Sequence, residues 1–270
     1  MSSTPFPAVA TVPLRASPAD AEHFAAPICR NCMAAMATRF CAACGQEKTR
    51  RLNLLSVGGE VWQNFRLFEF SVVKAAWRLL NTPGLVARAY VLGARKQHVH
   101  PLKLLLVAIG LLLLVLGRSQ ALASQDARVS EAMTIVQAYA NWSFSIGIVA
   151  IVLASAAVFM WRQPYNLTEH LVLGVYVHFL VIVASVINLL PTLVFRDPHW
   201  LALHKAWSSG PMSAVEALIV MRAYAQFFDT SWRRSTARLL LAGLVFVAVK
   251  WLLLRLYAIV LVKLVLARLH

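Results

Sequence analysis

Four cysteines stand close together near the N-terminus in the pattern C-x2-C-x8-C-x2-C: Cys29, Cys32, Cys41 and Cys44. Two residues between thiolates allow one tight turn to direct both sulfurs at the same metal ion. Two such knuckles complete a tetrahedral set of four sulfurs, which suits zinc. Because four thiolates leave no open coordination position, the metal would be structural rather than catalytic. The pattern predicts a small zinc ribbon over residues 27–47, whose folding depends on the metal.

A redox-active dithiol pair and an iron–sulfur cluster are the competing interpretations of these cysteines. No alternation of strands and helices surrounds either C-x2-C pair, which disfavours the dithiol. A disulfide framework is not expected either, because the sequence contains no other cysteine and a cytosolic segment would keep these thiols reduced.

The remaining composition is that of a membrane protein. Of 270 residues, 60% are hydrophobic and 14% are charged, and the mean hydropathy is +0.66, whereas soluble domains carry about 25% charged residues. The apolar residues are concentrated in runs long enough to cross a bilayer as helices. We expect an all-α polytopic membrane protein of four or five transmembrane helices behind the ribbon. The predicted spans are about 101–117, 142–161, 171–195, 211–228 and 239–260.

The net charge of +15 arises from 26 Lys and Arg against 11 Asp and Glu. In a membrane protein such basicity first indicates topology and contact with anionic lipid. Twelve of the cations but only five of the acids precede residue 101, which places the N-terminal region in the cytoplasm by the positive-inside rule. Five spans, which we favour, would place the C-terminus outside, whereas four would place it inside.

The chain divides into four predicted parts. Residues 1–26 form a flexible leader without the apolar core of a signal peptide, and residues 27–47 form the cytosolic ribbon. Residues 48–98 form interfacial amphipathic helices, which either lie along the membrane surface or pack against the bundle, and residues 99–270 form the transmembrane bundle. Basic residues near the membrane are predicted to contact lipid headgroups: Arg50, Arg51, Arg66, Lys74, Arg78, Arg88, Arg95 and Lys96.

Several further motifs follow the first cysteine pair in order: Phe40-Cys41-x2-Cys44-Gly45-Gln46, Pro83-Gly84, Tyr90-x2-Gly93-x-Arg95, and His100-Pro101 before a Leu-rich span. Together they resemble a bacterial family of zinc-ribbon polytopic membrane proteins of unknown function. The resemblance covers about residues 27–120 and implies an inner-membrane protein with a cytosolic ribbon and N-terminus; it implies no known reaction. Met33 stands where that family usually has glycine, which would loosen one knuckle, and His98 replaces its usual aromatic residue.

Ionisable residues within the predicted spans are expensive to bury and often functional. They define a candidate intramembrane polar site of His178, Glu216, Arg222, Lys250 and Arg255. A structural ion pair between Glu216 and Lys250 or Arg255, and an interhelical hydrogen bond for His178, remain the simpler interpretations.

These features favour an interaction or recruitment module, or a membrane sensor, whose partners are a cytosolic protein and anionic lipids. The alternative is a small transporter or lipid-handling protein that uses the polar residues of the later spans. No nucleophile–base pair, acidic metal site or cofactor fingerprint is visible, so we expect no enzyme and no cofactor besides zinc. Nucleic acid is a less favoured partner, because interfacial cations account for the same basic residues.

Overall fold

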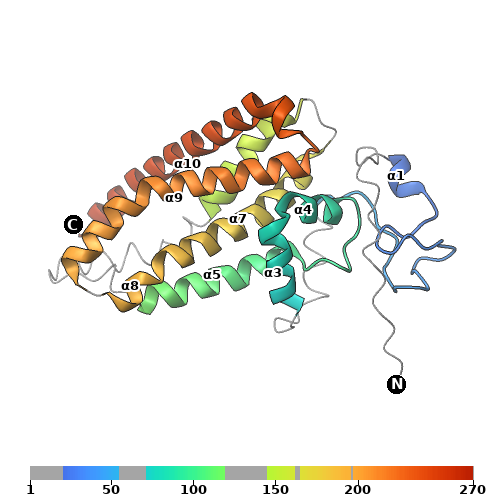
Figure 1. Ribbon diagram of the computed structural model, residues 1–270, viewed down its shortest axis with the longest axis horizontal. Coiled ribbons are helices and arrows are strands. Elements are labelled where there is room, and N and C mark those ends of the chain that lie inside the picture. The colour runs from blue at the N-terminus through green and yellow to red at the C-terminus, as the bar shows by residue number, and fades with distance from the viewer. Residues whose placement is uncertain (1–20, 55–70, 119–144, 162–164, 196, 270) are drawn as a thin grey trace, which may run out of the picture.

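The computed structural model describes residues 21–54, 71–118, 145–161, 165–195 and 197–269, and these are almost entirely helical (Figure 1). The predicted leader and Arg66 therefore lie outside the described residues. The helices are α1 (Ala21–Ala25), α3 (Ser71–Asn81), α4 (Pro83–Val91), α5 (Pro101–Arg118), an unlabelled helix at Ser145–Phe159, α7 (Leu167–Leu189), α8 (Pro191–Val194), α9 (Pro198–Phe227) and α10 (Trp232–Leu269).

Among the described residues, three helical segments are long and apolar enough to cross a membrane: Pro101–Arg118, Leu167–Val194 and Ser235–Lys263. They correspond to the first, third and fifth predicted spans and suggest a membrane location. The prediction of four or five spans is wrong in its count. The described part of the second predicted span is a shorter apolar helix, Ser145–Phe159.

The fourth predicted span belongs to α9, which is a longer helix than its sequence pattern indicated. At 30 residues α9 is long enough to span a bilayer, but polar and charged residues interrupt its apolar character: Lys205, Ser208, Ser209, Ser213, Glu216 and Arg222. Glu216 is buried against other helices. Among the described helices, α9 is therefore not a candidate span, and the prediction of a span at 211–228 is wrong.

The helix α7 occupies the centre of the bundle. It packs against α4, α5 and α9, and α9 in turn packs against α10. In the apolar segment that contains α7, 72% of the most hydrophobic stretch is buried inside the protein, compared with 39% for α5 and 11% for α10. The segment in α10 is therefore an apolar helix with most of its surface turned outward, as lipid contact requires.

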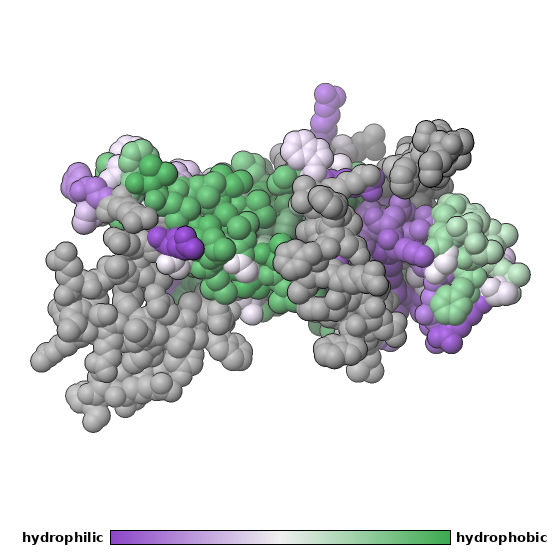
Figure 2. Space-filling view, turned by 90° about the horizontal axis from the view of Figure 1, so that it is seen from below, coloured by the Kyte–Doolittle hydropathy of each residue, from purple (hydrophilic) through white to green (hydrophobic). Residues whose placement is uncertain are grey.

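The face drawn in Figure 2 has a hydrophobic middle. Figure 2 shows hydrophobic residues spread over the helices, and hydrophilic residues where the bundle meets the N-terminal unit. In Figure 1 the cysteine-containing segment lies at one end of the bundle, beside α4, and the chain ends at the opposite end. A bilayer around the hydrophobic middle would place the cysteines on one side of the membrane, near the starts of α5, α7 and α10.

The Pro83-Gly84 pair joins α4 to the end of α9. Proline fits the first turn of a helix, where its missing N–H needs no partner, and Pro83 begins α4. The Gly84 N–H donates to Gln226 Oε1 over 3.0 Å. A Cβ at Gly84 would lie 2.1 Å from the carbonyl oxygen of Ala223, so only glycine allows the two helices to approach this closely.

Candidate metal centre and intramembrane pocket

The four cysteine sulfurs form one cluster, as the spacing predicts. All four lie within 4.8 Å of one another. The sulfurs of Cys29 and Cys44 are 3.6 Å apart, and those of Cys32 and Cys41 are 3.5 Å apart. A tetrahedron with Zn–S bonds of about 2.3 Å has sulfur–sulfur edges of about 3.8 Å. The cluster therefore fits a tetrahedral metal ion, and no rearrangement of the backbone is needed to bring the sulfurs together.

The two knuckles fold in the same way. In the first, the Met33 N–H donates to the Cys29 carbonyl over 2.8 Å; in the second, the Gly45 N–H donates to the Cys41 carbonyl over 2.7 Å. Met33 and Gly45 each follow the second cysteine of their knuckle, and both are left-handed, with φ of 64° and 68°. The substitution of methionine for glycine thus keeps the turn, at the steric cost that a Cβ brings to this backbone conformation.

The environments of the thiols differ. Hydrogen bonds from the backbone N–H groups of Cys44 and Ala43 lower the pKa of Cys41 to about 7. Burial raises the pKa of Cys29, whose side chain is almost fully enclosed. Because a metal binds thiolates, loading this site must release protons, and affinity must fall as the solution becomes more acidic.

The cysteine unit is hydrogen-bonded to the loop between α4 and α5. Next to the second knuckle, Gln46 donates from Nε2 to the Gly93 carbonyl over 2.8 Å and accepts from the Lys96 N–H over 2.9 Å. Within the first knuckle, Asn31 accepts from the Gln97 N–H over 3.0 Å, and its carbonyl accepts from Gln97 Nε2 over 3.0 Å. One side chain within the first knuckle and one just after the second thus fix the unit to the bundle.

The loop is shaped to receive these contacts. Gly93 has a φ of +105°, and a Cβ there would lie 2.6 Å from Thr49 Oγ1. Two residues later, Arg95 donates to the Arg50 carbonyl over 2.6 Å. Tyr90, three residues before Gly93, is buried and packs edge-to-face with Tyr176 of α7 at 5.8 Å between ring centroids. The Tyr90-x2-Gly93-x-Arg95 motif therefore forms the seat of the cysteine unit.

A second connection joins the segment after the ribbon to the start of α7. Arg51 donates from Nε and Nη2 to the two carboxylate oxygens of Glu169, over 2.9 and 3.0 Å, and Glu169 is fully buried. Asn166 caps α7 by accepting from the Glu169 N–H and also donates to the Leu52 carbonyl over 3.1 Å. Glu169 thus completes a helix cap and a salt bridge at once.

The basic residues predicted to contact headgroups have varied surroundings. Arg50 is exposed, and Arg78 is partly buried. Lys96 Nζ donates to the Cys44 carbonyl, whereas Arg88 is buried with its Nη1 3.5 Å from Asp229 Oδ2. Arg51 is occupied by Glu169, as described above, and nothing is described of the Lys74 side chain.

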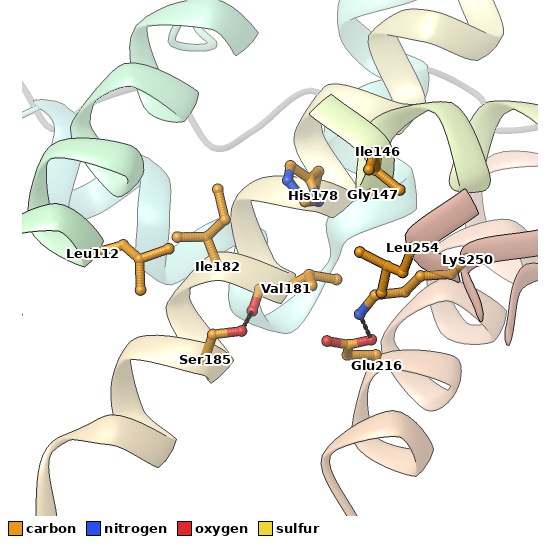
Figure 3. Close-up of a pocket in the computed structure, with 10 residues that line it drawn as sticks. All are labelled: Leu112, Ile146, Gly147, His178, Val181, Ile182, Ser185, Glu216, Lys250 and Leu254. Atoms are coloured by element: carbon orange, nitrogen blue, oxygen red, sulfur yellow. Dashed lines mark hydrogen bonds and ion pairs between the residues drawn. The ribbon is translucent and has the colours of Figure 1, made fainter. Parts of the chain in front are cut away.

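The candidate intramembrane site separates into two groups. His178, Glu216 and Lys250 line one cavity of about 130 Å³ (Figure 3), and Lys250 forms an ion pair with Glu216. The other two predicted residues are placed elsewhere: Arg222 donates to the Asn81 carbonyl over 2.6 Å, and Arg255 stacks on the Trp251 ring at 4.5 Å.

Some residues at these sites had no signal in the sequence. Ser185 lines the cavity and donates to the Val181 carbonyl over 2.9 Å. Gly147 also lines it: a Cβ there would lie 2.2 Å from Cε1 of His178. Gln46 and Gly93 were visible in the sequence only as members of motifs.

The fold and the sites define a class: a helical protein with membrane-length apolar helices and a four-cysteine candidate metal centre at one end. Within the chain, residues 71–113 match the family described as "Protein of unknown function (DUF3667)". The matched residues run from the start of α3 into α5 and include Gly84, Tyr90 and Gly93, the positions that join α4 to α9 and seat the cysteine unit. No curated protein and no solved structure matches the chain.

Proposed function

We propose that the protein is a membrane-anchored interaction module whose zinc-stabilised cysteine unit binds a cytosolic protein partner. The observation that carries this proposal is the attachment of both knuckles to the α4–α5 loop through Asn31 and Gln46. A flexible tether would suffice to localise a ribbon. Hydrogen bonds from each knuckle instead hold it in one orientation, which favours a surface presented at a defined place beside the membrane.

Zinc, when bound, supplies structural stability to a unit too small to build a hydrophobic core. Cys29, Cys32, Cys41 and Cys44 would hold it. With four sulfur donors there is no position for a substrate, so the proposal assigns these residues no reaction. Their role is to fix the two turns from which Asn31 and Gln46 project.

The second knuckle carries a surface suited to recognition. Phe40 is 54% exposed, and the Arg39 guanidinium lies 5.6 Å from its ring centroid. Arg39 also pairs with Glu47 over 2.8 Å. An exposed aromatic ring beside an arginine is a combination enriched in protein interfaces. Neither residue takes part in the Asn31 and Gln46 contacts, so this surface remains available when the unit is attached.

The proposed arrangement places the cysteine unit on the cytoplasmic side of the inner membrane. The excess of cations before residue 101 supports this orientation. Arg50 and Lys48 are exposed in the segment that joins the unit to the bundle. Such cations attract anionic headgroups at about 1 kcal/mol each near the surface, so anionic lipid would contribute to holding the unit at the membrane.

The test is a crosslinked pull-down of the full chain, with zinc measured on the same samples. The Cys41→Ser/Cys44→Ser variant should lose both the metal and the partner. Phe40→Ala should retain zinc at one ion per chain and lose the partner, because it removes only the exposed ring. Glu22→Ala, which changes an exposed residue of α1 outside the second knuckle, serves as the surface control. Identical captured proteins from the wild type and both test variants would overturn the proposal.

A second candidate function is supported by the cavity in the bundle. A small transporter or lipid-handling protein requires a polar site shared between helices, and α7, α9 and α10 bring His178, Glu216 and Lys250 to one. Glu216→Gln changes the charge of this cavity. If it abolished transport or lipid binding by the reconstituted protein and left the pull-down result unchanged, this function would be favoured over the first.

A further inference from the structure

We propose that the cavity between α5, the helix Ser145–Phe159, α7, α9 and α10 binds the ring of a neutral, lipid-soluble carbonyl compound of the quinone class. This inference deepens the second candidate function, since it names a ligand class for that site, and it is independent of the cysteine unit. It rests on the depth of the cavity, its size, its balance of charge and the chemistry of its lining.

The cavity lies midway along the apolar helices. Lys250 is near the middle of the Ser235–Lys263 segment, and His178 is near the middle of Leu167–Val194. In a bilayer both residues would lie close to the centre of the hydrocarbon core. Lys250 retains 25% of its side-chain exposure, so the cavity is open at the lysine. A ligand that arrives there from the membrane must itself be soluble in hydrocarbon.

The size of the cavity fits one six-membered ring. Its volume is about 130 Å³, and an engineered protein cavity of about 150 Å³ holds benzene. Apolar side chains from four helices make up much of the wall: Leu112, Ile146, Val181, Ile182 and Leu254. An apolar wall with a few converging polar groups is the usual composition of a small-molecule site.

The charges in the cavity favour a neutral ligand over an ion. Figure 3 shows Lys250 and Glu216 meeting at one side, with His178 and Ser185 from α7 around the same space. The ion pair between Lys250 and Glu216 cancels its own charge. With a neutral imidazole the lining carries no net charge. An added anion would face the Glu216 carboxylate, and an added cation would face the Lys250 ammonium.

The ion pair nevertheless offers hydrogen bonds of both kinds. An ammonium has three N–H donors, and Glu216 accepts one from Lys250. A carbonyl oxygen of a quinone can accept another, and the hydroxyl group of the corresponding hydroquinone can donate to the carboxylate. A donor and an acceptor side by side in an apolar wall thus suit both the quinone and the hydroquinone. A hydrocarbon ring could form no hydrogen bond with either group.

Gly147 sets the space available beside His178. Because a Cβ at this position would lie 2.2 Å from His178 Cε1, the imidazole must move if the residue becomes alanine. His178 and Gly147 both line the cavity. Gly147→Ala therefore offers a way to alter the shape of the cavity without changing any charge.

The experiment uses the full chain in detergent, with a decyl-substituted benzoquinone as the probe and decylbenzene as a probe without carbonyl groups. We expect saturable binding of the quinone that decylbenzene does not displace. Lys250→Met should weaken binding roughly tenfold, as the loss of one charge-assisted hydrogen bond predicts, and Gly147→Ala should weaken it at least as much. Arg255→Met, which removes a cation of the same helix outside the cavity, should bind as the wild type does.

Helix content by circular dichroism and zinc content would establish that each variant is folded. Equal binding of the quinone and decylbenzene would show partitioning without recognition and would overturn the proposal. So would equal affinity in the wild type, Lys250→Met and Gly147→Ala. Partner capture through Phe40 should be unchanged by Lys250→Met, so this proposal and the interaction module can fail separately.

Discussion

Gln46 and Gly93 are 47 positions apart in the chain, yet Nε2 of Gln46 donates to the carbonyl of Gly93 over 2.8 Å. The same amide accepts from Lys96, so one buried side chain bridges two backbone groups of the α4–α5 loop. This bridge unites two motifs, Cys41-x2-Cys44-Gly45-Gln46 and Tyr90-x2-Gly93-x-Arg95. The cysteine unit and the helical bundle are thereby joined by a buried side chain.

Replacing Gln46 should weaken the attachment of the cysteine unit to the bundle without removing its zinc. Gln46→Ala leaves the Gly93 carbonyl and the Lys96 N–H without their side-chain partner, at roughly 1–3 kcal/mol for a buried polar group left unsatisfied. We expect zinc content to remain normal and amide hydrogen exchange to accelerate in residues 92–97. Glu47→Ala removes only an exposed ion pair and should change neither. Unaltered exchange in Gln46→Ala would show that the bridge does not hold the unit.

Met33→Gly should stabilise the metal centre. Met33 has a φ of 64°, and a residue with a Cβ loses about 1–2 kcal/mol in this conformation, partly offset by the greater freedom of glycine in the unfolded chain. We expect slower loss of zinc to a chelator, by a factor of a few. Met36→Gly changes the same residue type outside the knuckle turns and should not slow the loss. Faster zinc loss from Met33→Gly would contradict the strain argument.

Gly84→Ala should disrupt the packing of α4 on α9. The added Cβ would lie 2.1 Å from the Ala223 carbonyl and 2.6 Å from the Phe227 nitrogen, both backbone atoms that cannot rotate away. We expect a loss of about 3 kcal/mol or more in unfolding free energy, measured by thermal or denaturant unfolding in detergent. Gly110→Ala in α5 meets no atom within 4 Å and is the matched control. Similar stability of the two variants would refute the close-approach explanation.

His98 makes stability depend on pH. Burial, with a smaller contribution from the positive charge of Arg78, lowers the pKa of His98 from 6.5 to about 4. The unfolded chain therefore binds this proton more readily than the folded chain does. The contribution of His98 is complete above pH 6.5 and is lost as the pH falls towards about 4. The loss should amount to about 3 kcal/mol at most.

The variant that checks this prediction is His98→Phe, which places a nontitrating ring at the same position. Unfolding free energy measured across the range from pH 7 to 4 should fall less steeply in His98→Phe than in the wild type. His199→Phe, in the first turn of α9, is the control and should retain the wild-type slope. Parallel pH profiles for all three proteins would exclude His98 as the source.

The sequence predicted the parts of this protein whose signals are local. The spacing of Cys29 and Cys32 allowed one turn to present two sulfurs, and continuous apolar runs identified α5, α7 and α10. The span count failed because polar residues, Glu216 among them, interrupt the apolar character of α9, and because the described part of the second predicted span is the short helix Ser145–Phe159. A charged residue on a helix also gives no indication of its partner. Glu216 meets Lys250, whereas Arg222 and Arg255 turn to Asn81 and Trp251.

Glu169 fixes the far end of the short segment that joins the cysteine unit to the bundle. At one end of this segment Gln46 is hydrogen-bonded to the loop before α5. At the other end Arg51 donates to the carboxylate of Glu169 in the first turn of α7. The orientation of the cysteine unit is therefore tied to two places in the bundle, the loop before α5 and the buried first turn of α7, and a displacement of the unit would have to break or move both contacts.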